Sequence, residues 1–486
     1  MKAGDLLQET KFPEFGLERW RALAEKALGG AAFEDALVSR TDDGIRIDPL
    51  AARFPGATPR AMRSDPLSPW IVTQRIDDPD PHRANRQALE DIEQGATGLA
   101  LIFEGAPNAF GYGLPAKPEA LAIALHNVPF NRVHIRLDVH PASRASVDWL
   151  VVLLGKRRAD PAKLSVSFGI DPAAAFAGNG SLRMSIEALR ASMPQSLAHF
   201  FALGLPGILL EGDGRVFHNA GATEAQELGI ALASAVSHLR MFEEARQALV
   251  YAAPHIGFSA CVDQDQFLSI AKLRALRLLW ARVQETCSIP PAPGAIHVET
   301  SYRMMTAMDP ETNILRTTIA CFAAAAGGAD TVAILPHSIA HGLPDAFARR
   351  IARNTQLILA KESHIDFVAD PTAGSGNVEA LTSALCEAAW DEFRLIESEG
   401  GILDSLVAGK VQSRVIAARN KRADDYRQGK RQIIGTTLYP QKSERPVSVL
   451  EAARRSVSGD GAVSCERLEP MRIDQTMPAK SGGPAQ

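Results

Sequence analysis

The sequence has few aromatic residues, few cysteines and no strong excess of either charge. Phe, Trp and Tyr make up 6% of its 486 residues, which disfavours a surface that stacks the bases of single-stranded nucleic acid. Its 52 Lys and Arg against 56 Asp and Glu give a formal charge of −4, so nothing attracts the chain as a whole to nucleic acid or an anionic membrane. The five cysteines form no C-x-x-C pair, so a zinc ribbon or a redox dithiol has no support in the sequence.

Long apolar runs are also missing. The run 149–154 is too short to span a bilayer, and the Ala-rich stretch 319–329 is typical of a packed helix end. Residues 1–15 carry three acidic side chains and lack the apolar centre of a signal peptide. With 46% hydrophobic and 22% charged residues, the composition is that of a globular protein. We expect a soluble, cytoplasmic protein.

From about residue 70 to 400, short apolar runs alternate with amphipathic helices. Continuous apolar runs of this length are typical of parallel strands covered on both faces. Eight strand–helix units predict a closed (β/α)₈ TIM barrel, with an open doubly wound sheet as the alternative. The expected strands are 98–103, 132–139, 164–169, 207–211, 295–300 and 330–335, with weaker candidates at 255–260 and 364–368. The expected helices are 117–127, 144–156, 183–203, 222–252, 263–287, 310–327, 344–361 and 377–398.

The barrel is expected to occupy residues 66–400. Residues 1–65 are predicted to form an N-terminal arm with helical spacing over 15–28. Residues 401–442 follow as a charged helical extension. Residues 443–486 are rich in Ser, Pro, Gly and charge, which predicts a flexible tail without a packed core.

Two glycine-rich stretches lie where loops are expected. Residues 105–113 lack the G-x-G-x-x-G spacing of a dinucleotide-binding turn, and a tight turn explains their glycines equally well. Residues 374–376 precede a helix, where backbone amides suit a phosphate. The Lys-Ser/Thr of a P-loop is absent there, which favours a simple helix entry.

Three histidines are candidate functional groups. His140 follows Asp138 at the end of an expected strand, His218 precedes a long helix, and His297 lies inside a strand. These places suit catalysis in a barrel, but a structural histidine in a polar layer is the favoured interpretation for each. None has a second histidine at i+4 or accompanies a G-x-S-x-G elbow, so metal-dependent and serine hydrolysis lack their usual signatures. No metal ion is expected.

Arg349 and Arg353 lie one turn apart in a helical pattern and share a face. Two such guanidinium groups suit a phosphate or carboxylate ligand. A solvated face and an intersubunit salt bridge are equally compatible with the pattern. Taken alone, the residues predict a (β/α)₈ protein without a demonstrable catalytic constellation.

Six segments, in this order, are similar to the methylmalonyl-CoA mutase family and together span about residues 65–440. Each segment is a weak signal alone, whereas six in register make a specific assignment. The segments are Pro69-Trp70 with Gln74, Ala220-Gly221-Ala222-Thr223 with Glu227-Leu228, AKLRALRLLWA over 271–281, Thr306-Ala307 with Asp309, Arg349 with Arg353-Asn354-Thr355-Gln356, and Asp370-Pro371 with Gly374-Ser375 and Val378-Glu379.

This resemblance implies conversion of methylmalonyl-CoA to succinyl-CoA by a radical generated from adenosylcobalamin. In the family's catalytic chain the barrel lies over the corrin, the CoA tail runs along the barrel axis, and a C-terminal flavodoxin-like domain holds the cobalt. The residues that follow Pro440 are too few for that domain. The Asp-x-His of its cobalt-binding motif is matched only by Asp138–His140, inside the barrel. We therefore expect this chain to lack the cobalamin domain.

Other departures fall on the family's functional positions. Arg215-Val216 stand where a Tyr-His pair is expected, Asp65 replaces a Tyr of active chains, and Thr73 replaces a CoA-contacting Arg. A radical enzyme needs a dry pocket whose donors stabilise the migrating group, and these changes remove much of it. His297 does match a barrel histidine of the family, but Glu299 replaces the Gln that follows it.

The pattern His218-Asn219-Ala220-Gly221-Ala222 resembles the small, or beta, subunit of heterodimeric bacterial mutases. That resemblance implies a barrel that has lost substrate binding and pairs with a large catalytic subunit, which holds adenosylcobalamin. Contacts with the large subunit are expected at 15–28, at the Arg349 and Arg353 face, and at 402–428.

Two alternatives stay open. The first is an active acyl-CoA mutase half that uses a separate cobalamin-binding protein, with His218, His297 and Arg353 as its catalytic candidates. The second and weaker is a (β/α)₈ lyase or aldolase, for which a lysine at the end of a strand would be needed. None of the expected strands ends in Lys.

Overall fold

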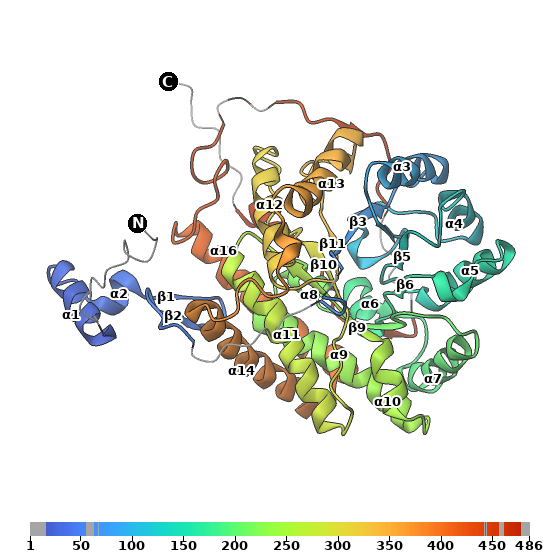
Figure 1. Cartoon of the computed structure of the whole chain (residues 1–486), viewed down its shortest axis with the longest axis horizontal. Helices are drawn as coiled ribbons and strands as arrows, with labels where there is room; N and C mark the ends of the chain where they lie inside the picture. Colours follow the sequence, from blue (N-terminus) through green and yellow to red (C-terminus); the bar gives the residue numbers. More distant parts are fainter. Residues whose placement is uncertain are drawn as a thin grey trace, which may run out of the picture.

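A barrel of eight parallel strands, ringed by helices, forms the centre of the computed structural model, which describes residues 16–54, 63–66, 68–441, 443, 445–455 and 461–477 (Figure 1). The strands follow the order β6-β5-β4-β3-β11-β10-β9-β8. The ring closes where Ser167 pairs with Ile208, just before β8, and the Phe168 amide donates to the Ile208 carbonyl at 2.8 Å. The strands are β3 (Ile71–Ile76), β4 (Gly98–Leu101), β5 (His134–Leu137), β6 (Val166–Phe168), β8 (Leu210–Asp213), β9 (Ile256–Val262), β10 (Ile296–Thr300) and β11 (Thr331–Ala333).

The predicted TIM barrel is confirmed, and closure of the ring excludes the open doubly wound sheet. Each strand is followed by a helical segment, and the long helices form the outer ring. The helices from β3 to the end of the barrel are α3 (Pro81–Glu93), α4 (Pro118–Ala124), α5 (Ser143–Lys156), α6 (Pro172–Asn179), α7 (Ile186–Ala202), α8 (Arg215–Ala220), α9 (Glu224–Glu244), α10 (Leu249–Ala252), α11 (Gln266–Thr286), α12 (Thr312–Ala326), α13 (Ala346–Lys361) and α14 (Gly376–Ser398).

Capping residues fix where several of these helices begin. Asp80 and Asp171 each precede a proline at the first helical position, and their carboxylates accept the next backbone amides. Thr223 and Gln226 form a reciprocal capping box at the start of α9. These short polar residues lie directly after the buried strands or their loops, so the local sequence sets the turn from strand to helix.

One expected strand is wrong and one real strand was not expected. Residues 364–368 form the 3₁₀-helix η5 (Ile365–Phe367), because His364 adopts a left-handed backbone at φ 54° and the chain leaves the barrel. The remaining strand is β3, whose central Thr73, Gln74 and Arg75 interrupt the apolar pattern. β3 is buried nonetheless, because these polar side chains find partners inside the protein.

The described part of the N-terminal arm comprises α1 (Leu17–Ala27), α2 (Phe33–Leu37) and a short hairpin of β1 (Ser39–Arg40) and β2 (Arg46–Ile47). Figure 1 shows α1 and α2 projecting to one side of the barrel. The hairpin turn holds the arm to the body, because Asp42 pairs with Arg422 and Arg431. No residue of α1 is buried.

The C-terminal residues pack onto the barrel. After α15 (Ile402–Val407) and α16 (Lys410–Arg427), β13 (Val449–Leu450) pairs with β12 (Leu343–Pro344), and β14 (Val463–Ser464) pairs with β7 (Ser181–Leu182). Leu468 is 1% exposed and belongs to the main core. The expectation of a flexible tail without a packed core is therefore wrong for these residues. The prediction relied on the lack of a periodic apolar pattern, whereas these residues pack through strand pairing and a few separate apolar side chains. In the part of the chain that is described, no helix is both long and apolar enough to cross a bilayer.

Candidate functional site

Ionisable residues line the inside of the barrel at two-residue spacing. Alternate residues of a strand share one face, so each such pair points toward the barrel axis. The pairs come from four different strands and the residues that follow them. They are Arg75 with Asp77, Arg136 with Asp138, Glu211 with Asp213, and His297 with Glu299.

Buried ion pairs connect these strands across the axis. Arg75 on β3 pairs with Glu299 on β10, and its Nε donates to Asp77 at 3.1 Å. Arg136 on β5 pairs with Glu211 on β8, and its Nη2 donates to Glu211 Oε2 at 2.7 Å. Each of these side chains is at most 6% exposed.

A third arginine joins the cluster where β8 ends. Arg215 pairs with Asp138 at the end of β5 and, at 2.6 Å, with Asp213. We call Arg75, Arg136, Arg215, Asp138, Glu211, Asp213 and Glu299 the axial ion-pair layer.

The charges in this layer are matched by shifts in pKa. Burial raises the pKa of Asp213 and of Glu299, which relieves the excess of carboxylates over guanidinium groups. Asp138 is equally buried, but Arg215 and Arg136 hold its pKa well below the usual range. The layer therefore fills the axis with compensated charge rather than with an open passage.

A cavity of about 490 Å³ lies below the layer, at the N-terminal ends of the strands. His134 and His297 line it, and Arg136 with Glu211 limits it toward the axis. His297 bonds to the Thr331 hydroxyl at 2.6 Å through Nδ1, and its Nε2 has no hydrogen-bond partner among the described residues. Burial, with Arg136 and Arg215 nearby, keeps the pKa of His297 well below its ordinary value, so the imidazole is neutral.

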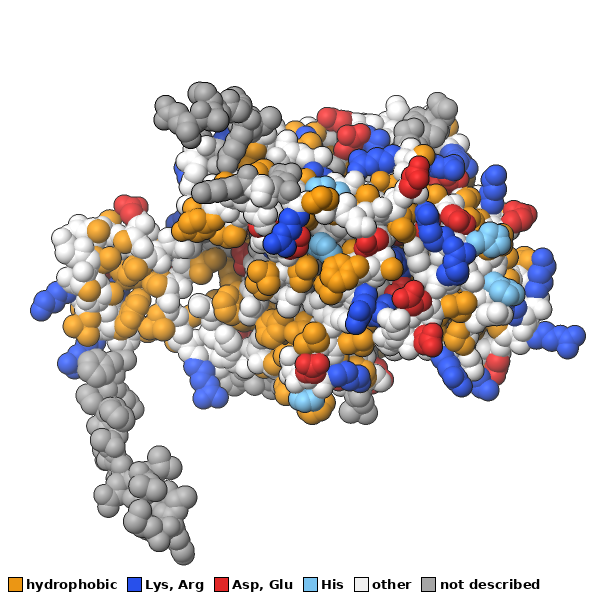
Figure 2. All heavy atoms as spheres, turned by 90° about the horizontal axis from the view of Figure 1, so that it is seen from above, with side chains coloured by type: hydrophobic (Ala, Val, Ile, Leu, Met, Phe, Trp, Pro, Cys, Tyr) orange, Lys and Arg blue, Asp and Glu red, His pale blue; other side chains and the backbone are white. Residues whose placement is uncertain are grey.

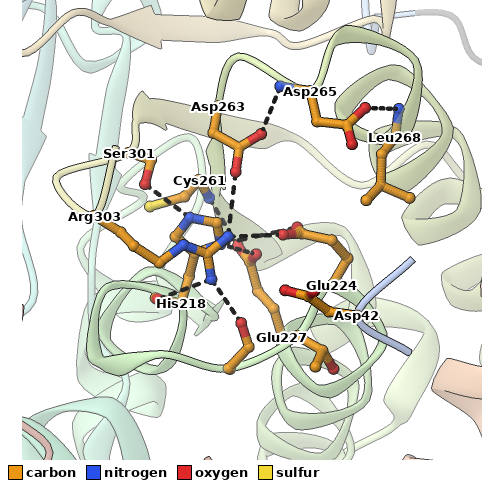
Figure 3. Close-up of polar contacts among 12 residues, drawn as sticks. Asp42, His218, Glu224, Glu227, Cys261, Asp263, Asp265, Leu268, Ser301 and Arg303 are labelled. Atoms are coloured by element: carbon orange, nitrogen blue, oxygen red, sulfur yellow. Dashed lines mark hydrogen bonds and ion pairs between the residues drawn. The ribbon is translucent and has the colours of Figure 1, made fainter. Parts of the chain in front are cut away.

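His218 lies in a different place, on α8, in a buried polar cluster (Figure 3). Its Nδ1 lies 2.8 Å from a Glu227 oxygen and its Nε2 lies 2.9 Å from the Ser301 hydroxyl. Among the described residues, His218, Glu224 and Glu227 bring their ligand atoms within 4.8 Å of one another, close enough to share a metal ion.

A lysine already supplies the positive charge of this cluster. The Lys272 ammonium bonds to both Glu224 and Glu227, the latter at 2.7 Å, and Arg303 bonds to Glu224 at 3.0 Å. Although burial opposes it, the two carboxylates raise the pKa of Lys272. Burial, together with Arg303 and Lys272, lowers the pKa of His218. The cluster is thus an internal salt-bridge network, and no carboxylate charge is left to bind a cation.

Arg353 faces inward rather than toward a ligand or partner. Its guanidinium bonds to Asp91 and Gln94 at the end of α3, and it is 2% exposed. Arg349 bonds to the same Asp91 and, at 2.8 Å, to the Arg75 carbonyl. The expected subunit contact at this face is therefore wrong, because both arginines are buried and bond to the Asp91 carboxylate on α3.

The remaining motifs are structural. His140 donates through Nε2 to the Glu104 carbonyl at 2.9 Å and accepts the Ala142 amide at Nδ1. The Gly374 amide donates to the Glu379 carboxylate at 3.1 Å, which occupies the place that a phosphate would need. Of the three catalytic candidates, His297 lies at the N-terminal ends of the strands, His218 on α8 and Arg353 on α13, outside β3. The structure does not bring them together.

The C-terminal ends of the strands are covered by the chain itself. Phe110 and Tyr302 stack there at 4.2 Å between ring centroids. Arg472 donates to the Tyr302 hydroxyl at 3.1 Å, and the Ile473 amide donates to the Arg303 carbonyl at 3.0 Å. Ligands of (β/α)₈ enzymes bind at this end, so this covering occupies the usual active-site surface.

Sequence reasoning missed most of the axial ion-pair layer. Arg215 was singled out only as a replacement for a family residue, and Arg75 and Arg136 were not singled out at all. A signal was present, because charged residues at i and i+2 inside otherwise apolar strands must share the barrel's inner face. The partner of each charge lies on a distant strand, as with Arg75 and Glu299, and only the fold reveals it.

The fold and interior define a class: a (β/α)₈ barrel whose axis is closed by ion pairs. Residues 48–479 match the family model of methylmalonyl-CoA mutase. The chain therefore belongs to the methylmalonyl-CoA mutase family, as its motifs predicted.

Relatives with both subunit names match the chain. It is 38% identical to a methylmalonyl-CoA mutase small subunit of Streptomyces virginiae over 460 residues, which cover 90% of this chain and 72% of that protein. It is 32% identical to the small subunit of Propionibacterium freudenreichii over 468 residues, covering 90% and 70%. The large subunit of Streptomyces virginiae is 25% identical over 503 residues, covering 95% and 67%.

Proposed function

We propose that this chain is the small, non-catalytic subunit of a methylmalonyl-CoA mutase. In the complex, methylmalonyl-CoA is isomerised to succinyl-CoA at the large subunit, which holds adenosylcobalamin. The role of the small subunit is to stabilise and position that partner. The names of the small-subunit relatives and the identity to them support this assignment.

The axial ion-pair layer carries the non-catalytic part of the proposal. A CoA thioester threaded along the axis would have to displace three buried arginines and their carboxylates. Breaking even one buried ion pair costs about 3–5 kcal/mol, because an uncompensated charge remains. Arg136 and Glu211, which line the cavity below the layer, are paired with each other.

The C-terminal end of the barrel does not fit a corrin. The stacked Phe110 and Tyr302, with Arg472 over the Tyr302 ring, occupy the surface that the cofactor would need. We therefore derive no reaction step from this chain and assign the cofactor to the large subunit.

The N-terminal arm supports a contact with a partner chain. An isolated helix of 11 residues is marginal in water, and α1 buries none of its residues while exposing about half of Leu17 and of Leu23. A partner surface that covers this apolar side would stabilise the helix. Arg21 and Arg46, which pair with Glu34, would remain at the rim.

The decisive experiment assays the purified chain with methylmalonyl-CoA and adenosylcobalamin, alone and with the large subunit of the same organism. We expect no turnover alone, and a stable 1:1 complex with activity on mixing. Turnover by this chain with only a separate cobalamin-binding protein would refute the proposal and support an active mutase half.

His297→Asn provides an internal control in the active complex. His297 is the catalytic candidate that faces a cavity, so an active half would lose about 100-fold or more in kcat when it is replaced. A non-catalytic subunit would leave kcat within about twofold. A large loss of kcat with an intact complex would contradict the proposal.

A further inference from the structure

The outer side of α12 lacks the charged residues that water-facing helices usually carry. Between Thr312 and Ala326 the only charged side chain is Arg316, which points inward and bonds to Thr306, Asn313 and the Ile434 carbonyl. Leu315 and Ile319, one turn apart, are 65% and 40% exposed. An amphipathic surface helix normally places polar residues on its solvent side.

The apolar surface continues onto the neighbouring elements. Phe347 on α13 is 59% exposed and Phe367 in η5 is 75% exposed, and both elements pack against α12. We call the exposed side chains of Leu315, Ile319, Phe347, Ile358, Phe367 and Val368 the α12–α13 face.

Figure 2 shows the same contrast from above. Hydrophobic side chains gather over the middle of the molecule, on the side where Figure 1 places α12 and α13. Lys, Arg, Asp and Glu crowd the end where α3, α4 and α5 lie. The gathering of hydrophobic side chains is therefore a local feature of one side of the barrel.

The size of this surface matches the centre of a stable interface. Its six exposed side chains amount to on the order of 600 Å² of apolar area, against the about 300–600 Å² of the largest patch on a typical monomer. A stable interface buries about 800 Å² on each partner, with an apolar centre and a polar rim. Exposed Lys361, the last residue of α13, is placed to form part of such a rim. Exposed Arg350 lies one turn after Phe347 and adds a single cation to the outer side of α13.

We propose that the α12–α13 face is the surface on which the large subunit docks, an inference that rests on the proposed function. The large subunit of Streptomyces virginiae matches 95% of this chain, so two related barrels are available to pair. Docking against outer helices is side to side and leaves both ends of the partner barrel accessible to its ligands. A contact at either end would block one of them.

The test compares one doubly charged variant with a control variant in binding to the large subunit. Leu315→Arg with Phe347→Arg places two cations on the α12–α13 face, where their exposure leaves the fold intact. Tyr251→Arg is the control, because Tyr251 on α10 is an equally exposed apolar residue, 76% exposed, outside this face. Binding is measured by sedimentation and calorimetry, and folding by circular dichroism.

We expect the double variant to bind the large subunit at least about 100-fold more weakly, whereas the control binds within about threefold of the unchanged chain. Unchanged binding by the double variant would overturn the docking surface and leave the proposed function standing. Failure of the unchanged chain to bind would instead overturn the proposed function itself. Loss of self-association alone would assign the face to a second copy of this chain and overturn the proposal.

Discussion

Glu211 is the position at which the axial ion-pair layer is most directly tested. Its carboxylate accepts hydrogen bonds from Arg136 Nη2 and from the Ser259 hydroxyl, each at 2.7 Å. Glu211→Gln keeps the shape of the side chain and removes its charge. The nearest remaining carboxylate to Arg136 is then Asp138 at 3.4 Å, which Arg215 also requires.

The expected loss of stability follows from the buried charge that is left behind. Removing one partner of a buried ion pair costs about 3–5 kcal/mol, whereas an exposed pair contributes about 0–1 kcal/mol. Unfolding entropy is about 2 cal/mol/K per residue, so for 486 residues each kcal/mol shifts Tm by about 1 °C. We expect Glu211→Gln to lower Tm by about 3–5 °C and to lower the urea midpoint in parallel.

Two further variants separate this explanation from a general loss of packing. Asp391→Asn removes one partner of an exposed pair with Arg394, whose side chains are 77% and 70% exposed, and should cost less than about 0.5 kcal/mol. Replacing both Arg136 and Glu211 by Met should recover most of the stability, because no unpaired charge remains. A cost below about 1 kcal/mol for Glu211→Gln, similar to Asp391→Asn, would refute a dry, closed axis.

Three more predictions address other parts of the protein. In the Lys272→Ala variant, Zn²⁺ should bind His218, Glu224 and Glu227 and so raise Tm, whereas it should leave the Tm of the unchanged protein unaffected. A rise in Tm for both proteins would contradict the assignment of this cluster as a salt-bridge network. Burial raises the pKa of Asp171 from 3.8 to about 7, so the unfolding free energy should fall by up to about 4 kcal/mol as pH rises from 4 to 7. Urea titrations of Asp171→Asn should show a smaller dependence of this free energy on pH. An unchanged dependence would exclude Asp171 as its cause. Leu468→Ala should cost about 2–5 kcal/mol in urea unfolding if the C-terminal residues belong to the core, and a cost near zero would show that they do not.

The pH prediction for Asp171 has a defined sign. Its folded pKa lies above its unfolded value, so the folded state keeps a proton that the unfolded state has already lost between these values. Raising the pH through that window therefore favours unfolding. Above about pH 7 both states are ionised and the effect of this group levels off.

Sequence patterns predicted the barrel well, because most of its strands are apolar runs between capped helices. β3 was missed for the opposite reason: its Thr73, Gln74 and Arg75 are buried by pairing rather than by apolarity. The pattern at 364–368 looked like a strand, yet Phe367 and Val368 are exposed. The periodicity of a sequence indicates which residues share a face, but it does not indicate whether that face packs against another part of the protein.

The candidate site shows the same limit. The sequence placed His297 inside a strand, but nothing local distinguished a ligand site from the neutral, Thr331-bonded imidazole that the fold contains. Arg353 shares its face with Arg349, and the sequence does not reveal that Asp91, more than 250 residues earlier, receives both. Pairings across the barrel depend on strand register, which one sequence without its fold does not specify.

The ion-pair layer also limits how this barrel changes by single substitutions. Replacing Arg75 alone leaves Glu299 and Asp77 buried without this cation, and replacing Glu299 alone removes the ion pair that joins β3 to β10. Each first step toward an open axis therefore destabilises the protein before any passage exists. Opening the barrel axis therefore requires several substitutions together on β3, β5, β8 and β10. The ion-pair layer thus makes a change to an open axis difficult to reach by single substitutions.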